Sequence, residues 1–403
     1  MSVTTIRDVG IPLAVLGNKS GFKGVEGNGL VRGDVILDGG CVAGMVPATV
    51  HRDQPVILFP KLVDPHCHLD KCHTADRLDG IGGNLTEAIE AQRRDKDNWT
   101  GNDIRTRASR GLREYHASGT GLVRSHVDWG DTATPPSAWH VLRELAEERD
   151  DITLQLAALT SPLQMAEPEM ASDIAKAIPE GHALGMFVFG QQGYETAIRN
   201  AFEQAQSRNL LLDFHVDEGL DPALNGLEVI ADIALELNHS GPIMCGHAVS
   251  LSLRDQTTVG RIADKLARAE IAVTMLPSTN LYLQGRNGGT PKDRGVTLAH
   301  ELHRAGVRVL LGNDNVRDAF CPVGRHDPLF ALELGILSAH LDPPFDRWLP
   351  SITTDAAQAM GHAPTYVRGA ALPDLLVAQA SDLSNLICGA SLAPATQLSE
   401  VTQ

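Results

Sequence analysis

Cysteines are few in this sequence, and none is placed to act with another. The chain of 403 residues has six of them, and no two form a C-x-x-C pair. In a chain this long, with no signal-peptide pattern over residues 1–16, scattered cysteines are expected to be reduced thiols. We therefore expect a cytoplasmic protein without a disulfide framework.

Three further absences argue against whole classes of function. No apolar run approaches the ~20 residues that a membrane helix needs, so no membrane segment is expected. Lys and Arg total 34 against 50 Asp and Glu, which gives a net charge of −16 and no basic patch for a nucleic acid. No G-x-G-x-x-G follows a predicted strand, which argues against a dinucleotide cofactor. The expected partner is a small molecule.

Apolar residues are plentiful, at 43 %, and in the middle of the chain they gather in eight short runs. The runs cover residues 62–68, 121–128, 152–160, 183–190, 210–218, 242–251, 271–278 and 307–314. Most are rich in Val, Ile and Leu without polar alternation, which is typical of parallel strands buried on both faces.

Segments with helical spacing lie between these runs. They cover residues 103–116, 137–148, 195–207, 227–237, 254–269 and 296–305. Repeated alternation of strand and helix indicates an α/β protein with a (β/α)8 TIM barrel. An open doubly wound sheet would give the same alternation, but the count of eight and the polar strand ends favour a closed barrel.

The two ends of the chain have a different pattern. Residues 33–37 and 41–46 are apolar and are joined by Asp38-Gly39-Gly40, which predicts a β-hairpin. Residues 374–378 and 386–392 are predicted as strands, with Gly389 at a turn or bulge. We expect the end segments to pair as one small discontinuous β domain beside the barrel. The expected boundaries are residues 1–59 and 360–403 for the β domain and 60–359 for the barrel.

The first barrel run ends in Asp64-Pro65-His66-Cys67-His68, at the end of the strand where barrel enzymes place catalytic residues. Alternate residues of a strand point the same way, so His66 and His68 both face inward, about 6 to 7 Å apart. Cys67 faces away from them as a packing residue. Two such imidazoles can bind one metal ion, although a bare H-x-H also arises by chance.

Three other strand ends carry residues of the same kind. The fifth run ends with His215 and Glu218, the sixth contains His247, and the eighth ends at Asp314. Burial in the core explains any one of these histidines but not all of them together, so we expect one metal site at the barrel mouth. His126, at the second strand end, is expected to support a ligand through a hydrogen bond. Eight further histidines in predicted helices or loops are expected to be ordinary: His73, His116, His182, His239, His300, His303, His326 and His340.

Residues 62–71 (LVDPHCHLDK) strongly resemble the first-strand motif of the cytosine deaminase branch of the amidohydrolase superfamily. Later stretches resemble further motifs of this branch in the same order: residues 124–128 (RSHVD), 215–218 (HVDE), 283–286 (LQGR) and 322–324 (PVG). The resemblance covers about residues 60–340. It implies a metal-dependent deaminase that hydrolyses the exocyclic amine of a small nitrogen heterocycle and releases ammonia.

The resemblance also implies a ligand set for one divalent metal ion. His66, His68, His215 and Asp314 would bind it. Histidine and carboxylate ligands accept zinc, iron or manganese, so the identity of the metal stays open. The fourth strand end, residues 187–191, offers no Lys or Glu to bridge two ions, which favours a single ion.

Three residues would carry the reaction according to the same resemblance. Glu218 would shuttle protons to the ring nitrogen and to the leaving amine. His247 would hold the attacking water and polarise the developing oxyanion. Asp314 would accept the proton of the water in addition to binding the ion.

Several positions expected to bind substrate depart from the cytosine-specific enzymes. Ser161 stands near the place of a glutamine that reads the pyrimidine edge, and Gln164, three residues on, is a candidate to replace it. Asn315 takes the place of a second aspartate. Phe320 takes the place of a tryptophan and leaves more room. Pterin-like, triazine-like and purine-like rings therefore stay open beside cytosine-like pyrimidines.

Leu85 matches a pocket leucine of the branch and lies in a long segment after the first strand, residues 77–99. Gly80, Gly82 and Gly83 would let this segment move as a lid over the site. An ordinary surface loop explains the same pattern equally well.

Three other functions were weighed against the deaminase. A cyclic-amide hydrolase, acting on a hydantoin or lactam ring, would use the same barrel but usually needs a residue that bridges two ions. A binding protein on a decayed barrel would need neither Glu218 nor the full ligand set. The other zinc deaminase fold requires a P-C-x-x-C signature, which the chain lacks. No sequence feature sets the number of subunits, so a homo-oligomer stays open.

Overall fold

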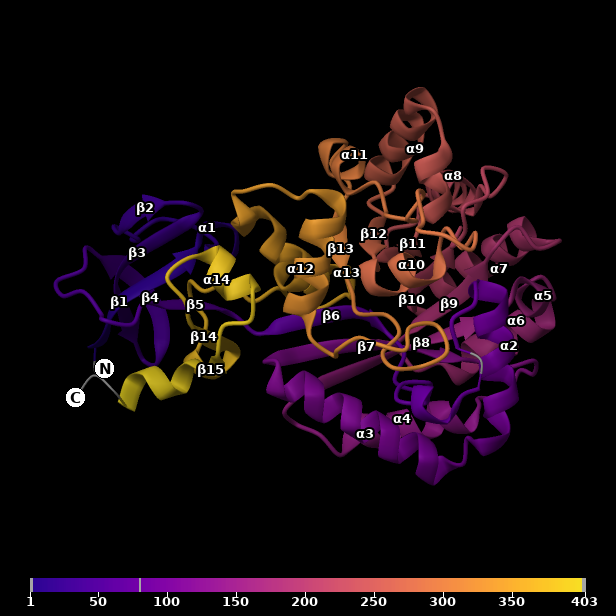
Figure 1. Cartoon of the computed structure of the whole chain (residues 1–403), viewed down its shortest axis with the longest axis horizontal. Coiled ribbons are helices and arrows are strands. Elements are labelled where there is room, and N and C mark those ends of the chain that lie inside the picture. Colours follow the sequence, from indigo (N-terminus) through magenta and orange to yellow (C-terminus); the bar gives the residue numbers. More distant parts are fainter. Residues whose placement is uncertain (1–2, 80, 401–403) are drawn as a thin grey trace.

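The middle of the chain and its two end segments form separate β-sheets (Figure 1). The computed structural model describes residues 3–79 and 81–400. Figure 1 shows the sheet of the end segments at the left, the barrel at the right, and helix α2 (Leu85–Asp95) at the far side of the barrel. No helix in the described ranges combines the length and apolar character needed to cross a membrane.

The central sheet has eight parallel strands in sequence order, which confirms the predicted barrel. They are β6 (Leu62–Cys67), β7 (Thr120–Asp128), β8 (Thr153–Thr160), β9 (Ala183–Val188), β10 (Leu211–Val216), β11 (Ile243–His247), β12 (Ala272–Met275) and β13 (Val309–Leu311). The first and last strands meet where the backbone N–H of Asp314 donates to the carbonyl of His66 over 2.8 Å. This contact closes the ring just where two of the expected site residues lie.

Helices alternate with the strands, and the six predicted ones are present. They are α3 (Gly101–Ala117), α4 (Ser137–Glu147), α7 (Tyr194–Arg208), α8 (Gly226–Glu236), α9 (Gln256–Arg268) and α11 (Ala299–Arg304). Additional helices are α5 (Pro162–Met165), α6 (Pro168–Ala177), α10 (Pro277–Leu283), α12 (Pro328–Ala339) and α13 (Thr354–Ala359). Short 3-10 helices are η1 (Ala75–Arg77), η2 (Lys96–Asn98), η3 (Val249–Leu253), η4 (Phe345–Ile352), η5 (Leu372–Asp374) and η6 (Ala395–Glu400).

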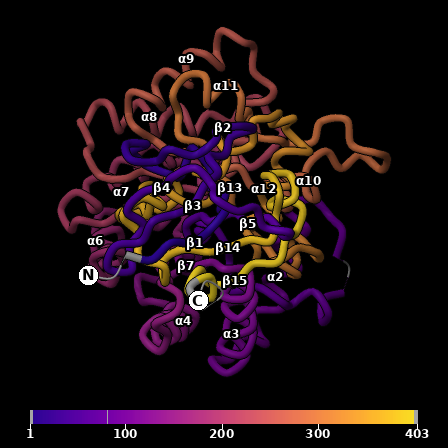
Figure 2. Tube along the Cα trace, turned by 90° about the vertical axis from the view of Figure 1, so that its left-hand side faces the viewer, coloured from indigo at the N-terminus to yellow at the C-terminus, as the bar shows by residue number. Residues whose placement is uncertain are grey.

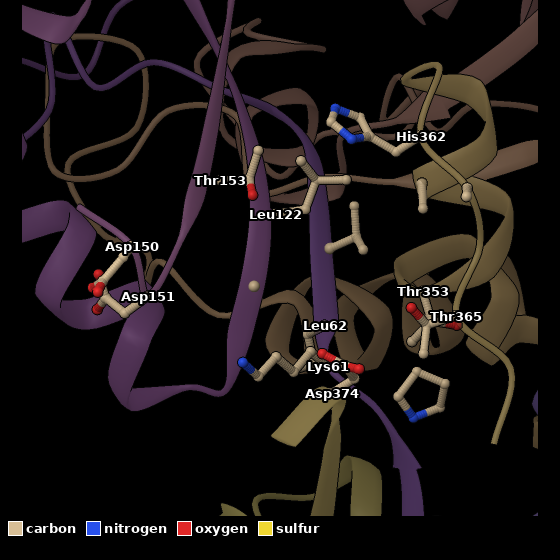
Figure 3. Close-up of a pocket in the computed structure, with 15 residues that line it drawn as sticks. Lys61, Leu62, Leu122, Asp150, Asp151, Thr153, Thr353, His362, Thr365 and Asp374 are labelled. Carbon is tan, nitrogen blue, oxygen red and sulfur yellow. The ribbon is translucent and has the colours of Figure 1, made fainter. Parts of the chain in front are cut away.

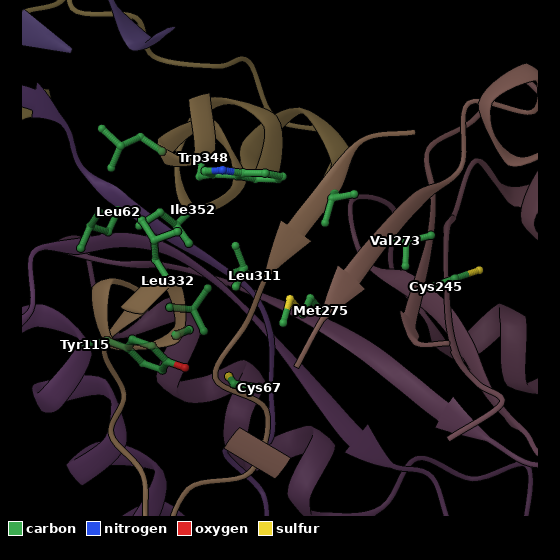
Figure 4. Packing of buried hydrophobic residues seen from close by; sticks show 14 of the residues in the cluster. Leu62, Cys67, Tyr115, Cys245, Val273, Met275, Leu311, Leu332, Trp348 and Ile352 are labelled. Carbon is green, nitrogen blue, oxygen red and sulfur yellow. The ribbon is translucent and has the colours of Figure 1, made fainter. Parts of the chain in front are cut away.

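Apolar packing between strands and helices fixes the barrel. Figure 4 shows Leu62, Leu311, Leu332 and Trp348, which belong to one continuous buried cluster. A smaller cluster fills the barrel where its strands begin, and there Met360, directly after α13, lies among the inward-facing residues of the strands. Barrel enzymes carry their functional sites at the opposite end, where the strands finish.

The end segments form a seven-stranded sheet, which confirms that the two ends of the chain pair. Its order is β15-β14-β5-β1-β3-β2, with β4 also on β3. The bounds are β1 (Val3–Pro12), β2 (Val25–Gly27), β3 (Leu30–Asp38), β4 (Cys41–Val46), β5 (Val56–Pro60), β14 (Leu375–Gln379) and β15 (Leu392–Pro394). The predicted hairpin is the antiparallel β3–β4 pair, and β14 pairs with β5 from the other end. Figure 2 views the molecule from the side of this sheet. The domain boundaries at 59/60 and 359/360 stay a prediction.

The predicted strand over residues 386–392 is wrong. Residues Leu383–Ile387 form helix α14, and the strand β15 begins only at Leu392. The side chain of Asp382 accepts a hydrogen bond from the N–H of Asn385 and so caps the helix. The buried residues Leu383, Leu386 and Ile387 follow helical spacing. The prediction took this apolar run for a strand, and that period was wrong.

Candidate active site

Four side chains of the kind that bind metals converge where strands β6, β10 and β13 end. The Nε2 atom of His215 lies 3.1 Å from Nε2 of His66 and 3.1 Å from Nε2 of His68. Asp314 Oδ1 lies 3.5 Å from Nε2 of His66 and 3.2 Å from Nε2 of His68. Ligand atoms of His66, His215, Asp314 and also His247 lie within 4.8 Å of one another.

This arrangement fits a divalent ion by its spacing and its unpaired atoms. Ligands about 2.0 to 2.1 Å from a tetrahedral ion lie about 3.3 Å from one another, close to the observed 3.1 to 3.5 Å. Both carboxylate oxygens of Asp314 are buried without a hydrogen-bond partner in the described part of the chain. Burial lowers the pKa of His68 to about 3 and keeps the imidazole neutral, as a metal ligand must be.

Glu218 and His247 stand beside this group. Glu218 Oε1 lies 3.6 Å from His247 Nδ1, and both side chains are buried. Burial, and then the charge of Asp314, raise the pKa of Glu218 well above its usual range, which favours the protonated carboxyl. Burial lowers the pKa of His247 to about 4, so its imidazole is neutral. Both side chains therefore stand beside the ligand group, where they can hold or move a proton.

The backbone turns sharply at the strand ends that carry these residues. Asp217, His247 and Asp314 have positive φ angles of 52°, 71° and 58°, a region that residues other than glycine adopt at functional sites more than elsewhere. The Asp217 carboxylate accepts the N–H groups of Gly226 and Leu227 over 3.0 Å each, at the start of α8. These two hydrogen bonds fix the turn that carries Glu218.

A cavity of about 430 Å³ opens from this group, in the size range of small-ligand sites. His68, His215, Glu218, His247 and Asp314 form part of its wall. Four of the five residues expected to bind substrate also line it: Leu85, Ser161, Asn315 and Phe320.

Gln164, the fifth of them, is not among the residues that line the cavity. Its carbonyl oxygen accepts the N–H of Ser161 over 3.0 Å, and its amide donates to the carbonyl of Thr132 over 3.2 Å. Ser161 and Gln164 form a capping box at the start of α5. The structure therefore brings Ser161 to the cavity and uses Gln164 to hold the loop.

A charged group in the cavity wall was not among the site residues predicted from the sequence. The Lys71 ammonium lies 3.0 Å from Asp128 Oδ1 and 5.1 Å from the centre of the Phe320 ring. Lys96 Nζ lies 3.1 Å from Asp128 Oδ2, and the Gln92 amide donates to the same oxygen. Lys71 is the last residue of the first-strand motif, residues 62–71, and that position was the only signal available. Gln92 Oε1 is buried without a partner among the described residues, so it is a free acceptor.

Beneath the ligand group lies a buried ion pair. Arg124 donates to Asp213 Oδ2 over 2.7 Å and to Gln155 Oε1 over 2.7 Å, with both charged side chains inaccessible to solvent. His126 lies between this pair and the ligand group, with its ring centre 4.0 Å from that of His66. Neither nitrogen of His126 has a hydrogen-bond partner in the described ranges. The supporting hydrogen bond expected of His126 is not present, and its contact with His66 is one of packing.

Helix α2 covers part of the cavity within the segment considered as a lid. Its residues Leu85, Ile89, Gln92 and Arg93 line the cavity from one face of the helix. Arg286, from the loop after α10, donates to the carbonyl of Gly82 over 2.7 Å and so holds the start of this segment. Gly80, one of the expected hinges, lies outside the described residues. Whether the segment moves stays a prediction.

A second cavity, of about 320 Å³, lies at the opposite end of the barrel (Figure 3). Leu62, Leu122 and Thr153, at the starts of their strands, line it together with Asp150 and Asp151. His362 is the one histidine in its lining. Barrel enzymes carry their catalytic residues at the other end, and the candidate metal ligands of this chain also lie there.

Comparison with known proteins defines the class of protein. The profile of the amidohydrolase family matches residues 78–366. The chain belongs to this family, which confirms the resemblance seen in the sequence.

Individual relatives show the same relationship. The pterin deaminase of Rhizobium rhizogenes (strain K84 / ATCC BAA-868) is 32 % identical over 354 residues, which cover 85 % of this chain and 80 % of that protein. The crystal structure of 5-methylcytosine deaminase from Klebsiella pneumoniae with phosphonocytosine has a TM-score of 0.78 at 23 % identity, covering 96 % of this chain and 95 % of that one. N-isopropylammelide isopropylaminohydrolase from Burkholderia multivorans has a TM-score of 0.72 at 21 % identity, covering 98 % and 97 %. These structures share the fold of this chain.

Proposed function

We propose that this protein is a metal-dependent aminohydrolase that removes the exocyclic amine of a small nitrogen heterocycle. In this reaction water adds to the ring carbon, the bond from that carbon to the amine nitrogen breaks, and ammonia leaves. One observation carries the proposal. A buried carboxyl, Glu218, whose pKa burial raises, lies in the same cavity wall as the candidate metal ligands His68, His215 and Asp314.

We propose that His66, His68, His215 and Asp314 hold one divalent ion, zinc or iron. When bound, such an ion lowers the pKa of water from 15.7 to about 7, which makes a nucleophile available at neutral pH. Two ions would need a bridging Lys or Glu at the end of β9, and the residue of that strand in the cavity wall is Phe187.

The protein's own groups would then manage the protons. Glu218, whose pKa burial raises, would donate its proton to the ring nitrogen. It would then take up a proton that the attacking water gives to Asp314 and donate it to the leaving amine, and the second proton of the water would restore the carboxyl. His247 carries its hydrogen on Nδ1, because the partner of that atom is the carbonyl oxygen of Asn280 at 3.0 Å. Nε2 of His247, which has no partner in the described part of the chain, is left to accept a hydrogen bond from the attacking water.

We propose a bicyclic pterin-like ring as the preferred substrate. The cavity of about 430 Å³ has room for two fused rings, and the pterin deaminase of Rhizobium rhizogenes is the relative with 32 % identity. Gln92 supports this assignment, because the free acceptor Oε1 would pair with a ring N–H while Asp128 fixes the amide orientation. A single-ring pyrimidine would leave part of the cavity unfilled.

A cyclic-amide hydrolase remains the second candidate, since it would use the same ligand group. At the end of β9, where such hydrolases carry a bridging Lys or Glu, the residue in the cavity wall is Phe187, which favours the deaminase. We also propose a reducing cytoplasm as the compartment, because all six cysteines are free thiols.

The proposal is tested by ammonia release from a panel of amino-heterocycles with the metal-loaded protein. The panel holds pterin, cytosine, 5-methylcytosine, isoguanine, guanine, creatinine and ammelide. We expect ammonia from pterin, a loss of about 100-fold or more in Glu218→Gln, and no loss in the exposed control Glu236→Gln. Hydrolysis of hydantoins without ammonia from any panel member would favour the cyclic-amide hydrolase.

A further inference from the structure

A second group of metal-ligand side chains lies apart from the cavity of the candidate active site. Cys72, His73 and His326 each offer one ligand atom, and these three atoms lie within 4.8 Å of one another. Cys72 and His73 lie in the turn after β6, and His326 lies in the loop before α12. None of the three lines the cavity of about 430 Å³.

The histidines of this group are buried without enough partners. The side chains of His73 and His326 are 3 % and 0 % exposed. Both ring nitrogens of His73 and Nε2 of His326 have no hydrogen-bond partner among the described residues. Buried polar atoms in native proteins are nearly always paired, so three orphan nitrogens in one place indicate a missing ligand.

Glu114, on α3, supports the group from its solvent side. Its Oε2 lies 2.8 Å from Nδ1 of His326 and 3.3 Å from Nε2 of His73. The bond to Nδ1 fixes the ring of His326 and leaves Nε2 free for an ion, as carboxylates do behind metal-binding histidines. The Glu114 side chain is 35 % exposed, which places the group next to solvent and gives an ion access.

The backbone around the group is adapted to bring these side chains together. His73 has a φ of 57°, in the left-handed region that side chains other than glycine rarely adopt. Gly111, on α3, leaves room for the ring of His326, since a Cβ atom there would lie 3.0 Å from Cε1. The turn at His73 and the space that Gly111 leaves beside His326 bring the two rings together, with their centres 5.3 Å apart.

We propose that Cys72, His73 and His326 bind a second divalent ion, zinc, with a water molecule completing a tetrahedral shell. One thiolate and two imidazoles are a zinc-type donor set, since soft thiolate selects zinc over magnesium, calcium or manganese. Burial raises the pKa of the Cys72 thiol. The ion therefore displaces the thiol proton, which is released to solvent on binding.

The site would join two segments that both carry active-site residues. Cys72 and His73 follow His68 by four and five residues, and His326 follows Asp314 by twelve. An ion that binds both segments would hold the two ligand-bearing strand ends in register. Its role is therefore to stabilise the candidate active site rather than to take part in the reaction.

The test is metal substitution with cobalt in the full-length protein. Chelator-stripped protein is titrated with Co²⁺, and its absorption and metal content are measured. We expect two ions per chain and a thiolate-to-cobalt charge-transfer band, which the candidate active site cannot give because it has no thiolate ligand. The variant Cys72→Ser should lose the band and one ion, while Cys245→Ser, another buried cysteine, should keep both.

Two further variants separate this site from the candidate active site. His215→Ala should lose one ion and keep the band, whereas His326→Gln should lose the band while keeping Cys72. His326→Gln also covers the case in which Cys72→Ser does not fold. A single ion per wild-type chain with no thiolate band, or a band that persists in Cys72→Ser, would overturn the proposal whatever the reaction at the other site.

Discussion

His247 donates a hydrogen bond from Nδ1 to Oδ1 of Asn280 over 3.0 Å. Asn280 lies on α10, after β12, and its side chain is buried. This pair could not be predicted from the sequence, because the two residues are 33 positions apart. The bond determines which nitrogen of His247 carries the hydrogen and which one faces the reacting groups.

Replacing Asn280 should therefore impair the reaction without removing the metal. We expect Asn280→Leu to lower kcat by about tenfold to a hundredfold, as the loss of such orienting partners does. Asn280→Asp keeps an acceptor for Nδ1 and should retain more activity than Asn280→Leu. Steady-state kinetics and metal content would measure both, and equal activity of the two variants would contradict the assigned role.

Phe320 should set the size of ring that the cavity accepts. Phe320→Trp adds a ring to a wall that also holds Leu85 and Lys71, and overfilling a packed site costs about 1 to 3 kcal/mol. We expect kcat/KM for pterin to fall about tenfold or more, with a smaller loss for 5-methylcytosine. Phe330→Trp, on α12 and outside the cavity, is the matched control. An equal loss for both rings would show that Phe320 does not discriminate by size.

The buried pair of Arg124 and Asp213 should matter for stability more than any pair on the surface. Arg124→Met leaves the Asp213 carboxylate uncompensated in the interior, and such losses cost about 3 to 5 kcal/mol. Replacing both, as Arg124→Met with Asp213→Leu, should recover part of the lost free energy of unfolding. Denaturant titration would measure this, with Arg199→Met, from an exposed pair with Glu236, expected to cost less than about 1 kcal/mol. A single variant no less stable than the surface control would refute the prediction.

Asp318 should make stability depend on pH. Burial raises the pKa of Asp318 to about 7, against about 3.9 in an unfolded chain. The folded protein binds the proton more tightly, so this stabilisation is fully present below pH 4 and is lost as the pH rises through about 7. We expect the free energy of unfolding of the wild type, relative to Asp318→Asn, to fall over that window by at most about 1.4 kcal/mol per pH unit. Parallel profiles from pH 4 to pH 8 would argue against the raised pKa.

Several features of the fold and the site could be predicted from the sequence. The eight strands follow from apolar runs of strand length, because a strand buried on both faces must be apolar throughout. His66 and His68 could be assigned to the interior because side chains alternate along any strand. His215, His247 and Asp314 could be assigned to the barrel mouth because they stand at the ends of predicted strands. The structure brings their ligand atoms within 4.8 Å, together with His66.

Other features depended on contacts between residues far apart in the chain. Ser161 was expected nearest the substrate and Gln164 was a candidate to replace the glutamine, but a capping box takes up the Gln164 amide and leaves only Ser161 at the cavity. His126 has packing contacts in place of the expected hydrogen bond. The strand predicted over residues 386–392 failed because one cap, Asp382, turned an apolar run into a helix.

The sequence by itself determined the barrel and the chemistry of its mouth, because side-chain direction in a strand and ligand type are local properties. Only the tertiary structure decided the partners: Asn280 for His247, Asp128 for Lys71, and Glu114 for His73 and His326. Hydrogen-bonded pairs of this kind, such as Glu114 with His326, form because a buried polar atom must find a partner wherever packing brings one within reach, whereas the nitrogens of His73 find none among the described residues. The spacing of residues along the chain does not show which side chains come into contact. For this reason His73 and His326 were expected to be ordinary, and only the fold shows that they lie side by side.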